Sequence, residues 1–180
     1  QIGSTSIDIR LGTSFQIFFP SQYGVVDFTN ESTIKDSMGN SRNINLDYLE
    51  DITLATGQFI LGHSMEYIKL DETISADLEG RSSFARLGIE IHMTAGFIDP
   101  GFEGVLTFEL FNAGPNPVKL YPGLRIGQLR FNKVNKPAKA YSKKRSAKYS
   151  GLLEHRYSLQ GLDYEIEKIK TEKSKKQLTQ

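Results

Sequence analysis

The stretch Val105-Leu106-Thr107-Phe108-Glu109-Leu110-Phe111 decides the fold class. Alternate side chains of an extended chain point to opposite faces, so Thr107 and Glu109 share one face and Phe108 lies on the other with the flanking leucines. This period of two is typical of a β-strand that covers a hydrophobic core with one side.

Similar runs recur on both sides of this stretch. The ranges expected to form strands are 5–11, 15–19, 58–61, 66–70, 89–93, 105–112, 118–121 and 126–131. Pairs such as Pro100-Gly101 and Pro122-Gly123 separate several of them, as turns between strands require. Many short strands at a spacing of about 8 to 12 residues favour an all-β sandwich or barrel over a parallel α/β sheet.

The sequence predicts little helix. Residues 82–87 allow one or two helical turns, and residues 162–176 form either a charged helix or a frayed end. Residues 30–48 are rich in Asn, Ser and Asp, which predicts a long loop.

Length and composition limit the class of protein. The chain has 180 residues, of which 38% are hydrophobic and 24% charged, and these values fit one globular domain. It contains no cysteine, which excludes a disulfide scaffold, a thiolate zinc site and a cysteine nucleophile, and fits the reducing cytoplasm. No run approaches the roughly 18 apolar residues of a membrane span. Because the chain begins at Gln1 without methionine, we expect that preceding residues are missing.

Charge is unevenly distributed along the chain. Residues 1–131 hold 9 Lys and Arg against 16 Asp and Glu, whereas residues 132–180 hold 13 against 5. A basic end is a solvated terminus, an arm for nucleic acid or another anionic surface, or a segment that closes over a phosphate-bearing ligand. In the last case, the tyrosines of residues 141–149 would lie near a sugar or base and the lysines near phosphates.

The strongest local feature is Gly80-Arg81-Ser82-Ser83-Phe84-Ala85-Arg86-Leu87-Gly88. Backbone N–H groups at the start of a helical turn, two hydroxyls and an arginine fork make an anion site, and a triphosphate is the obvious small-molecule anion. The alternative is a capped turn with Ser82 or Ser83 at the N-cap and both arginines on the surface. The chain has no Walker A loop and no dinucleotide-binding glycine fingerprint.

Glu109 is a candidate general acid/base. It stands among apolar neighbours in its strand, and burial raises the pKa of a carboxyl group towards neutral pH. The alternative is an edge-strand charge that points to water. Asp99 precedes Pro100-Gly101. Its alternative interpretation is a turn residue whose side chain hydrogen-bonds only to the backbone.

Other classes of enzyme lack support in the sequence. The three histidines, His63, His92 and His155, are far apart and show no metal-ligand spacing. Because thiolate ligands are also missing, a zinc deaminase of the cytidine type is excluded. No G-x-S-x-G elbow indicates a serine hydrolase.

These features, in this order, resemble the deoxycytidine triphosphate (dCTP) deaminase branch of the trimeric deoxyuridine triphosphatase (dUTPase) superfamily. The resemblance extends from residues 3–12 to residues 148–149 and is most specific at 81–88, 95–104 and 122–129. It implies a distorted β-barrel or jelly-roll protomer of the dUTPase-like type, a homotrimer with active sites shared between subunits, and a C-terminal segment that closes the site.

The resemblance also implies a domain organisation. We expect a single dUTPase-like domain over residues 1–157, with the closing segment from about residue 138, and a charged, mobile or helical tail over residues 158–180. In the closing segment, Leu152 stands where the family usually has a glutamine.

By position, the resemblance implies a role for each site residue. Glu109 would activate water for attack at C4 of cytosine and shuttle protons to the departing ammonia, without a metal at the base. Asp99 would contact the deoxyribose, and the backbone of Thr107 and Phe108 would line the base pocket. The residues implied to hold the triphosphate are Arg81, Ser82, Ser83, Phe84, Ala85 and Arg86, and further nucleotide contacts are Gln128, Tyr141 and Lys148. Mg²⁺ would be carried by the triphosphate, and no zinc is expected.

Two comparisons within the superfamily refine the assignment. True dUTPases typically have an apolar valine where this chain has Glu109, so Glu109 favours deamination. Monofunctional bacterial deaminases typically carry His-Arg where this chain has Gly96-Phe97, whereas Gly-Phe or Gly-Trp occurs in bifunctional forms that convert dCTP directly to dUMP. Gly96 and Phe97 therefore indicate a bifunctional enzyme.

The sequence thus predicts a cytoplasmic dCTP deaminase that acts on dCTP and dUTP as a homotrimer and supplies dUMP for thymidylate synthesis. No membrane or nucleic-acid partner is expected. The alternatives are a dUTPase in which Asp99 positions the attacking water, a monofunctional deaminase that releases dUTP, and a non-catalytic module that binds nucleotide or nucleic acid.

Overall fold

The computed structural model describes residues 1–3, 5–135, 151, 153 and 164–177. The chain divides into two compact units, one comprising Gln1–Ile17 and Asn43–Arg156 and the other Phe18–Arg42 and Tyr157–Gln180. The expected domain boundary between residues 157 and 158 lies outside the described residues, so that division stays a prediction.

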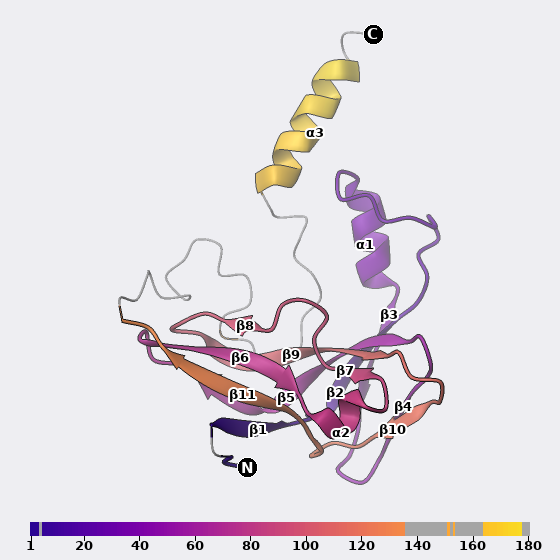
Figure 1. Ribbon diagram of the computed structural model, residues 1–180. Coiled ribbons are helices and arrows are strands. Elements are labelled where there is room, and N and C mark those ends of the chain that lie inside the picture. The colour runs from indigo at the N-terminus through magenta and orange to yellow at the C-terminus, as the bar shows by residue number, and fades with distance from the viewer. Residues whose placement is uncertain (4, 136–150, 152, 154–163, 178–180) are drawn as a thin grey trace. The chain divides into compact units, whose positions relative to one another are not determined.

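Antiparallel strands are the main regular structure of the described chain (Figure 1). The strands are β1 (Ser6–Arg10), β2 (Ser14–Phe18), β3 (Ser41–Asn45), β4 (Ile52–Leu54), β5 (Phe59–Lys69), β6 (Ile74–Gly80), β7 (Ile89–Glu90), β8 (Phe97–Ile98), β9 (Glu103–Asn112), β10 (Val118–Leu120) and β11 (Arg125–Lys133). One sheet has the order β1-β11-β6-β8, a second has the order β3-β2-β5-β9-β7, and β10 pairs with β4.

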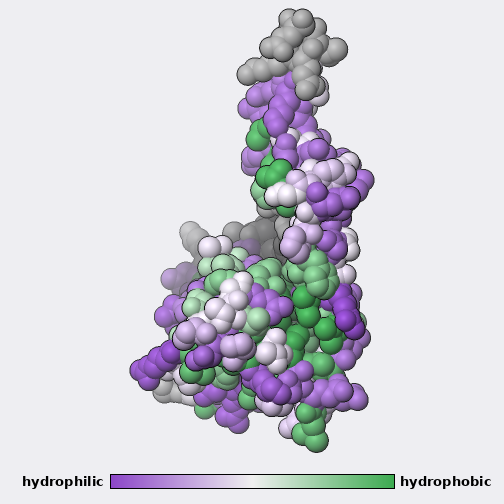
Figure 2. All heavy atoms as spheres, turned by 90° about the vertical axis from the view of Figure 1, so that its right-hand side faces the viewer, coloured by the Kyte–Doolittle hydropathy of each residue, from purple (hydrophilic) through white to green (hydrophobic). Residues whose placement is uncertain are grey.

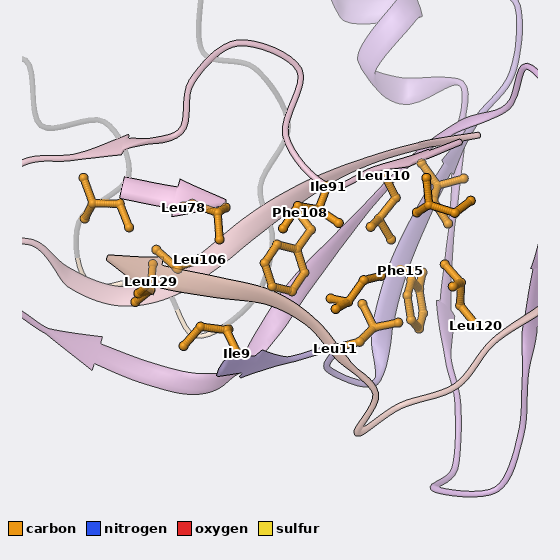
Figure 3. Packing of buried hydrophobic residues seen from close by; sticks show 14 of the residues in the cluster. Ile9, Leu11, Phe15, Leu78, Ile91, Leu106, Phe108, Leu110, Leu120 and Leu129 are labelled. Atoms are coloured by element: carbon orange, nitrogen blue, oxygen red, sulfur yellow. The ribbon is translucent and has the colours of Figure 1, made fainter. Parts of the chain in front are cut away.

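The hydrophobic core combines residues of the two larger sheets (Figure 3). Leu78 and Leu129 come from the four-stranded sheet, and Phe108 and Leu110 come from the five-stranded sheet. Phe108 and Leu110 are completely buried. The all-β fold predicted from the sequence is therefore confirmed, with two sheets that share one core and do not close into a barrel.

The runs 58–61 and 66–70, expected as separate strands, form the single strand β5. Its register against β9 shifts between His63 and Tyr67, which marks a bulge. The buried hydroxyl of Ser64 accepts a hydrogen bond from the N–H of Leu106 at 2.8 Å and donates one to the carbonyl of Glu66 at 2.7 Å. This hydroxyl satisfies backbone groups that the bulge removes from the ladder.

Four strands, β3, β4, β6 and β8, were not predicted. The longest of them, β6, pairs with β11 from Gly80 to Ile74. Its buried positions include Ser75 and Ala76 beside Leu78. Small side chains of this kind give a weak hydrophobic pattern, although they pack completely within the sheet.

The second unit contains helices α1 (Glu31–Gly39) and α3 (Tyr164–Gln177). The prediction of a loop over 30–48 is wrong, because α1 and β3 occupy most of it. Asn30 is the N-cap of α1, and its Oδ1 accepts the N–H of Ser32 at 3.0 Å. The polar residues interpreted as a loop thus initiate a helix. The charged helix anticipated over 162–176 is α3, and Lys173 lies 3.5 Å from Asp27.

Among the described residues, no helix combines the length and the apolar character that a membrane span requires.

Candidate active site

Glu109 lies on β9, in the five-stranded sheet between β5 and β7 (Figure 1). Burial alternates along β9 as predicted, with Phe108 and Leu110 buried and with Thr107 and Glu109 half-buried on the other face. Because β9 has a partner strand on each side, the interpretation of Glu109 as an edge-strand charge is wrong.

The Glu109 carboxylate has a fixed hydrogen-bond partner. Its Oε2 accepts the backbone N–H of Met93 at 2.7 Å, a length typical of a charge-assisted bond. The backbone N–H of Glu109 donates to the carbonyl of Ile91 at 2.9 Å, so one segment holds both the main chain and the side chain. Within the described ranges, no hydrogen bond engages the second oxygen, Oε1. The carboxylate is therefore oriented by one oxygen.

The neighbours of Glu109 in the sheet are partly apolar. Leu61 on β5 stands directly opposite Glu109, and His63 stands opposite Thr107. Side chains of opposite residues share one face of an antiparallel sheet, so the carboxylate lies between a buried leucine and a polar threonine. The side chain of Phe108 is fully buried in the core, which leaves its backbone as the part able to line the predicted base pocket.

The predicted anion-binding residues form the short helix α2 (Ser82–Ala85), which follows β6. Arg81 is its N-cap and makes no side-chain cap hydrogen bond, so the alternative in which Ser82 or Ser83 caps the turn is wrong. Phe84 packs against the core, whereas both serines, Ala85 and Arg86 are exposed. The serine hydroxyls make no hydrogen bond to the described part of the chain. Phe84 thus anchors a turn whose polar side chains face outward.

Arg81 lies half-buried where β1, β6 and β11 come together. Its Nη1 donates to the carbonyl of Arg125 at 2.8 Å, and its Nε lies 3.8 Å from Oδ1 of Asp8. Arg125 Nη1 lies 3.7 Å from Oδ2 of the same carboxylate. Gln128, on β11, accepts the Ser6 hydroxyl through its Oε1 at 3.2 Å. The sequence interpretation did not include Asp8 or Arg125, and the strand alternation of residues 5–11 was the only signal that pointed Asp8 away from the core.

The segment between β7 and β8 carries the other predicted residues. The carbonyl of Gly96 accepts the N–H of Leu78 at 2.7 Å, and a Cβ built on Gly96 would lie 2.9 Å from the Leu78 oxygen. A larger residue here therefore requires the backbone to shift. Phe97 begins β8 and is 61% exposed. Asp99 is half-buried, and its carbonyl accepts a backbone N–H within the turn that follows.

The described hydrogen bonds and ion pairs place the predicted residues in two groups. One group consists of Glu109 and the segment that contains Met93. The other consists of Arg81 and Gln128 near the ends of β1, β6 and β11. In the part of the chain that the structure describes, no hydrogen bond or ion pair joins Glu109 to Arg81 or Arg86.

Three residues of the predicted closing segment, Tyr141, Lys148 and Leu152, lie outside the described residues. Their implied roles stay predictions. Over the described ranges, no group of three or more His, Asp and Glu side chains is arranged to hold a metal ion.

Comparison with known protein families matches residues 1–134 to the family described as dCTP deaminase-like. A relative from Methanobrevibacter smithii named "dCTP deaminase, dUMP-forming" is 39% identical over 170 residues, which cover 93% of this chain and 86% of the relative. A relative of the same name from Methanoculleus marisnigri is 39% identical over 148 residues, which cover 82% of this chain and 75% of the relative. A relative from Thermomicrobium roseum named "dCTP deaminase" is 41% identical over 152 residues, covering 84% and 76%.

Comparison with solved structures supports the fold. The crystal structure of 2′-deoxycytidine 5′-triphosphate deaminase from Agrobacterium tumefaciens has a TM-score of 0.55 and 24% sequence identity, and the match covers 74% of this chain and 40% of that chain. The fold and this comparison define an all-β protein of the fold class seen in that deaminase structure. Within that class, the chain belongs to the dCTP deaminase family.

Proposed function

We propose that the protein is a dCTP deaminase that forms dUMP, with Glu109 as its general acid/base. The observation that carries this proposal is the oriented carboxylate of Glu109, held by the Met93 N–H at 2.7 Å in a chain of this family. The overall reaction consumes dCTP and two water molecules and yields dUMP, ammonia and diphosphate.

The geometry of Glu109 supports its role in deamination. The carboxylate takes a proton from the water that attacks C4 of cytosine. It transfers the two protons of this water in turn, one to the ring nitrogen N3 and one to the exocyclic amino group, which leaves as ammonia. The Met93 N–H leaves Oε1 of Glu109 to face the water and the leaving group.

The phosphate side of the site is built around Arg81 and helix α2. In this proposal, Arg81, Ser82, Ser83 and Arg86 bind the triphosphate, and Asp99 binds the deoxyribose. The exposure of both serines and of Arg86 supports this assignment. Mg²⁺ enters with the triphosphate as part of the substrate, coordinated by phosphate oxygens.

We also propose that the active enzyme is a homotrimer in the cytoplasm, with each site completed by residues of a neighbouring copy. Two observations support shared sites: Glu109 and Arg81 belong to separate groups of contacts, and large hydrophobic side chains reach the surface of the sheets. Figure 2 shows hydrophobic residues among polar ones on this surface. Examples are Phe97 on β8 at 61% exposure and Tyr67 on β5 at 46%. A mass in solution three times the 20.2 kDa of one chain is expected from light scattering. A monomer would refute this arrangement.

The experiment that tests the activity incubates the purified chain with Mg²⁺ and dCTP, and in parallel with dUTP. Products are separated by ion exchange while ammonia is assayed. We expect dUMP and ammonia from dCTP, with no accumulation of dUTP. Release of dUTP would identify a monofunctional deaminase, and reaction of dUTP alone would identify a dUTPase. No reaction with either nucleotide would refute an enzymatic role.

A further inference from the structure

Two arginines that are far apart in the sequence converge on one carboxylate. Arg81, which directly follows β6, and Arg125, the first residue of β11, lie 3.8 Å and 3.7 Å from the two oxygens of Asp8 on β1. Arg81 also donates to the carbonyl of Arg125 at 2.8 Å. The two guanidinium groups are therefore held close together by the sheet itself.

Within the described part of the chain, this pair carries an uncompensated positive charge. Asp8 supplies one negative charge for two guanidiniums, and both contacts are longer than the roughly 2.7–2.9 Å of a strong charge-assisted bond. The neighbouring Arg10 adds nothing to the excess, because its backbone N–H and Nε bind the Glu66 carboxylate at 2.8 Å and 2.7 Å.

Arg130, on the same strand as Arg125, has the opposite surroundings. It lies 3.2 Å from Asp77 and 3.8 Å from Glu79, so two carboxylates face one guanidinium. Its side chain is 58% exposed, compared with 52% for Arg125. The local charge therefore favours an anion at Arg125 and disfavours one at Arg130.

We propose that Arg125 is a second guanidinium that binds the triphosphate of the nucleotide together with Arg81, and that Asp8 is the positioning residue for both. This inference rests on the proposed function, since it adds a residue to the same phosphate site. Arg125 is suited to this task because the residues that follow it, Ile126 and Gly127, are buried and fix the strand. Two guanidinium groups held side by side present several N–H donors to phosphate oxygens. The phosphate oxygens outcompete the single Asp8 carboxylate for these donors.

The test compares Arg125→Gln with Arg130→Gln as the matched control. We expect Arg125→Gln to raise KM for dCTP and dUTP about tenfold or more while kcat changes little, because a charge-assisted contact to the ground state is lost. Arg130→Gln should leave KM within twofold of the wild type. Arg125→Lys should recover part of the affinity for the nucleotide, because lysine restores the positive charge but not the paired N–H donors of the planar guanidinium group.

A structural role of Arg125 would not reproduce the expected salt dependence. Added salt should weaken nucleotide binding less steeply in Arg125→Gln than in the wild type, because one screened charge has been removed. Equal KM values in Arg125→Gln and the wild type, or an equal rise in Arg130→Gln, would overturn the inference.

Calorimetric binding of dCTP and dUTP separates this inference from the proposed function. A wild-type chain that binds dCTP without converting it would refute the proposed function, and the same comparison of variants by binding constant would still decide the role of Arg125. A chain that binds neither nucleotide would overturn both.

Discussion

Replacement of Glu109 by glutamine tests the proposed chemistry most directly. The amide has the shape of the carboxylate, and its oxygen can still accept the Met93 N–H that now lies 2.7 Å from Oε2. It cannot take a proton from water or deliver one to a leaving amine. General acid/base catalysis contributes about 10²–10⁴-fold, which corresponds to roughly 3–5.5 kcal/mol of transition-state stabilisation.

The cost of the same change to stability is much smaller. A hydrogen bond to a charged acceptor contributes about 1.5–3 kcal/mol and one to a neutral acceptor about 0.5–1.5 kcal/mol, so the free energy of unfolding should fall by about 1 kcal/mol. Urea denaturation measures this loss, and ammonia release from dCTP measures the activity. The binding constant for dCTP should stay within a few-fold of the wild type.

Glu103→Gln is the matched control, because Glu103 lies on the same strand and face and pairs with Lys69 at 3.1 Å. This variant should keep wild-type ammonia release. Retention of more than about one tenth of the activity by Glu109→Gln would refute the assignment, since the expected loss is at least 10²-fold. Equal losses in both variants would point instead to a general effect of charge.

Three further predictions concern stability. Gly88 has a φ of +86°, and an added Cβ would lie 2.3 Å from the backbone nitrogen of Gly114, so Gly88→Ala should cost more than the roughly 1–2 kcal/mol of a left-handed residue. Gly57→Ala, at φ +74° with open space around the position, should cost only that amount in urea denaturation. Asn112→Leu should cost about 3 kcal/mol or more by the same assay, because the buried amide donates to two carbonyls and accepts the N–H of Gly114. Burial raises the pKa of the Glu66 carboxyl, but the contact with Arg10 opposes burial, and the pKa lies below 4.5. The ion pair therefore adds stability at neutral pH, and this stability is lost as the pH falls through the lowered pKa. The difference in unfolding free energy between wild type and Glu66→Gln, about 1–3 kcal/mol at pH 7, should therefore shrink in acid, and a constant difference down to pH 3 would contradict this account.

The sequence predicted those strands in which hydrophobic and polar residues alternate along the strand itself. β9 is clear because buried residues such as Phe108 and Leu110 alternate with half-buried ones from Leu106 to Asn112. β6 was missed because Ser75 and Ala76 are buried through pairing with β11, about fifty residues further along the chain. A single-sequence pattern contains no information on such non-local pairing.

In the candidate site, too, features with a local sequence pattern were predicted, and features that depend on non-local contacts were not. The position of Glu109 on the less buried face followed from alternation, and residues 81–86 were recognisable as a polar turn after a glycine. The partner of Glu109 is the backbone N–H of Met93, and no side-chain pattern identifies a backbone donor. The convergence of Arg81 and Arg125 on Asp8 depends on three strands that are adjacent only in the folded sheet.

The segment between β7 and β8 connects the chemistry of Glu109 to the rest of the fold. Ile91 and Met93 of this segment form hydrogen bonds with the backbone and the carboxylate of Glu109. The carbonyl of Gly96, in the same segment, accepts a hydrogen bond from Leu78 of the other sheet. A Cβ added to Gly96 would lie only 2.9 Å from the carbonyl oxygen of Leu78. A residue larger than glycine would therefore move the segment that orients the Glu109 carboxylate. The identity of residue 96 should therefore act on Glu109 through the backbone, and we expect a bulkier residue at this position to change the activity.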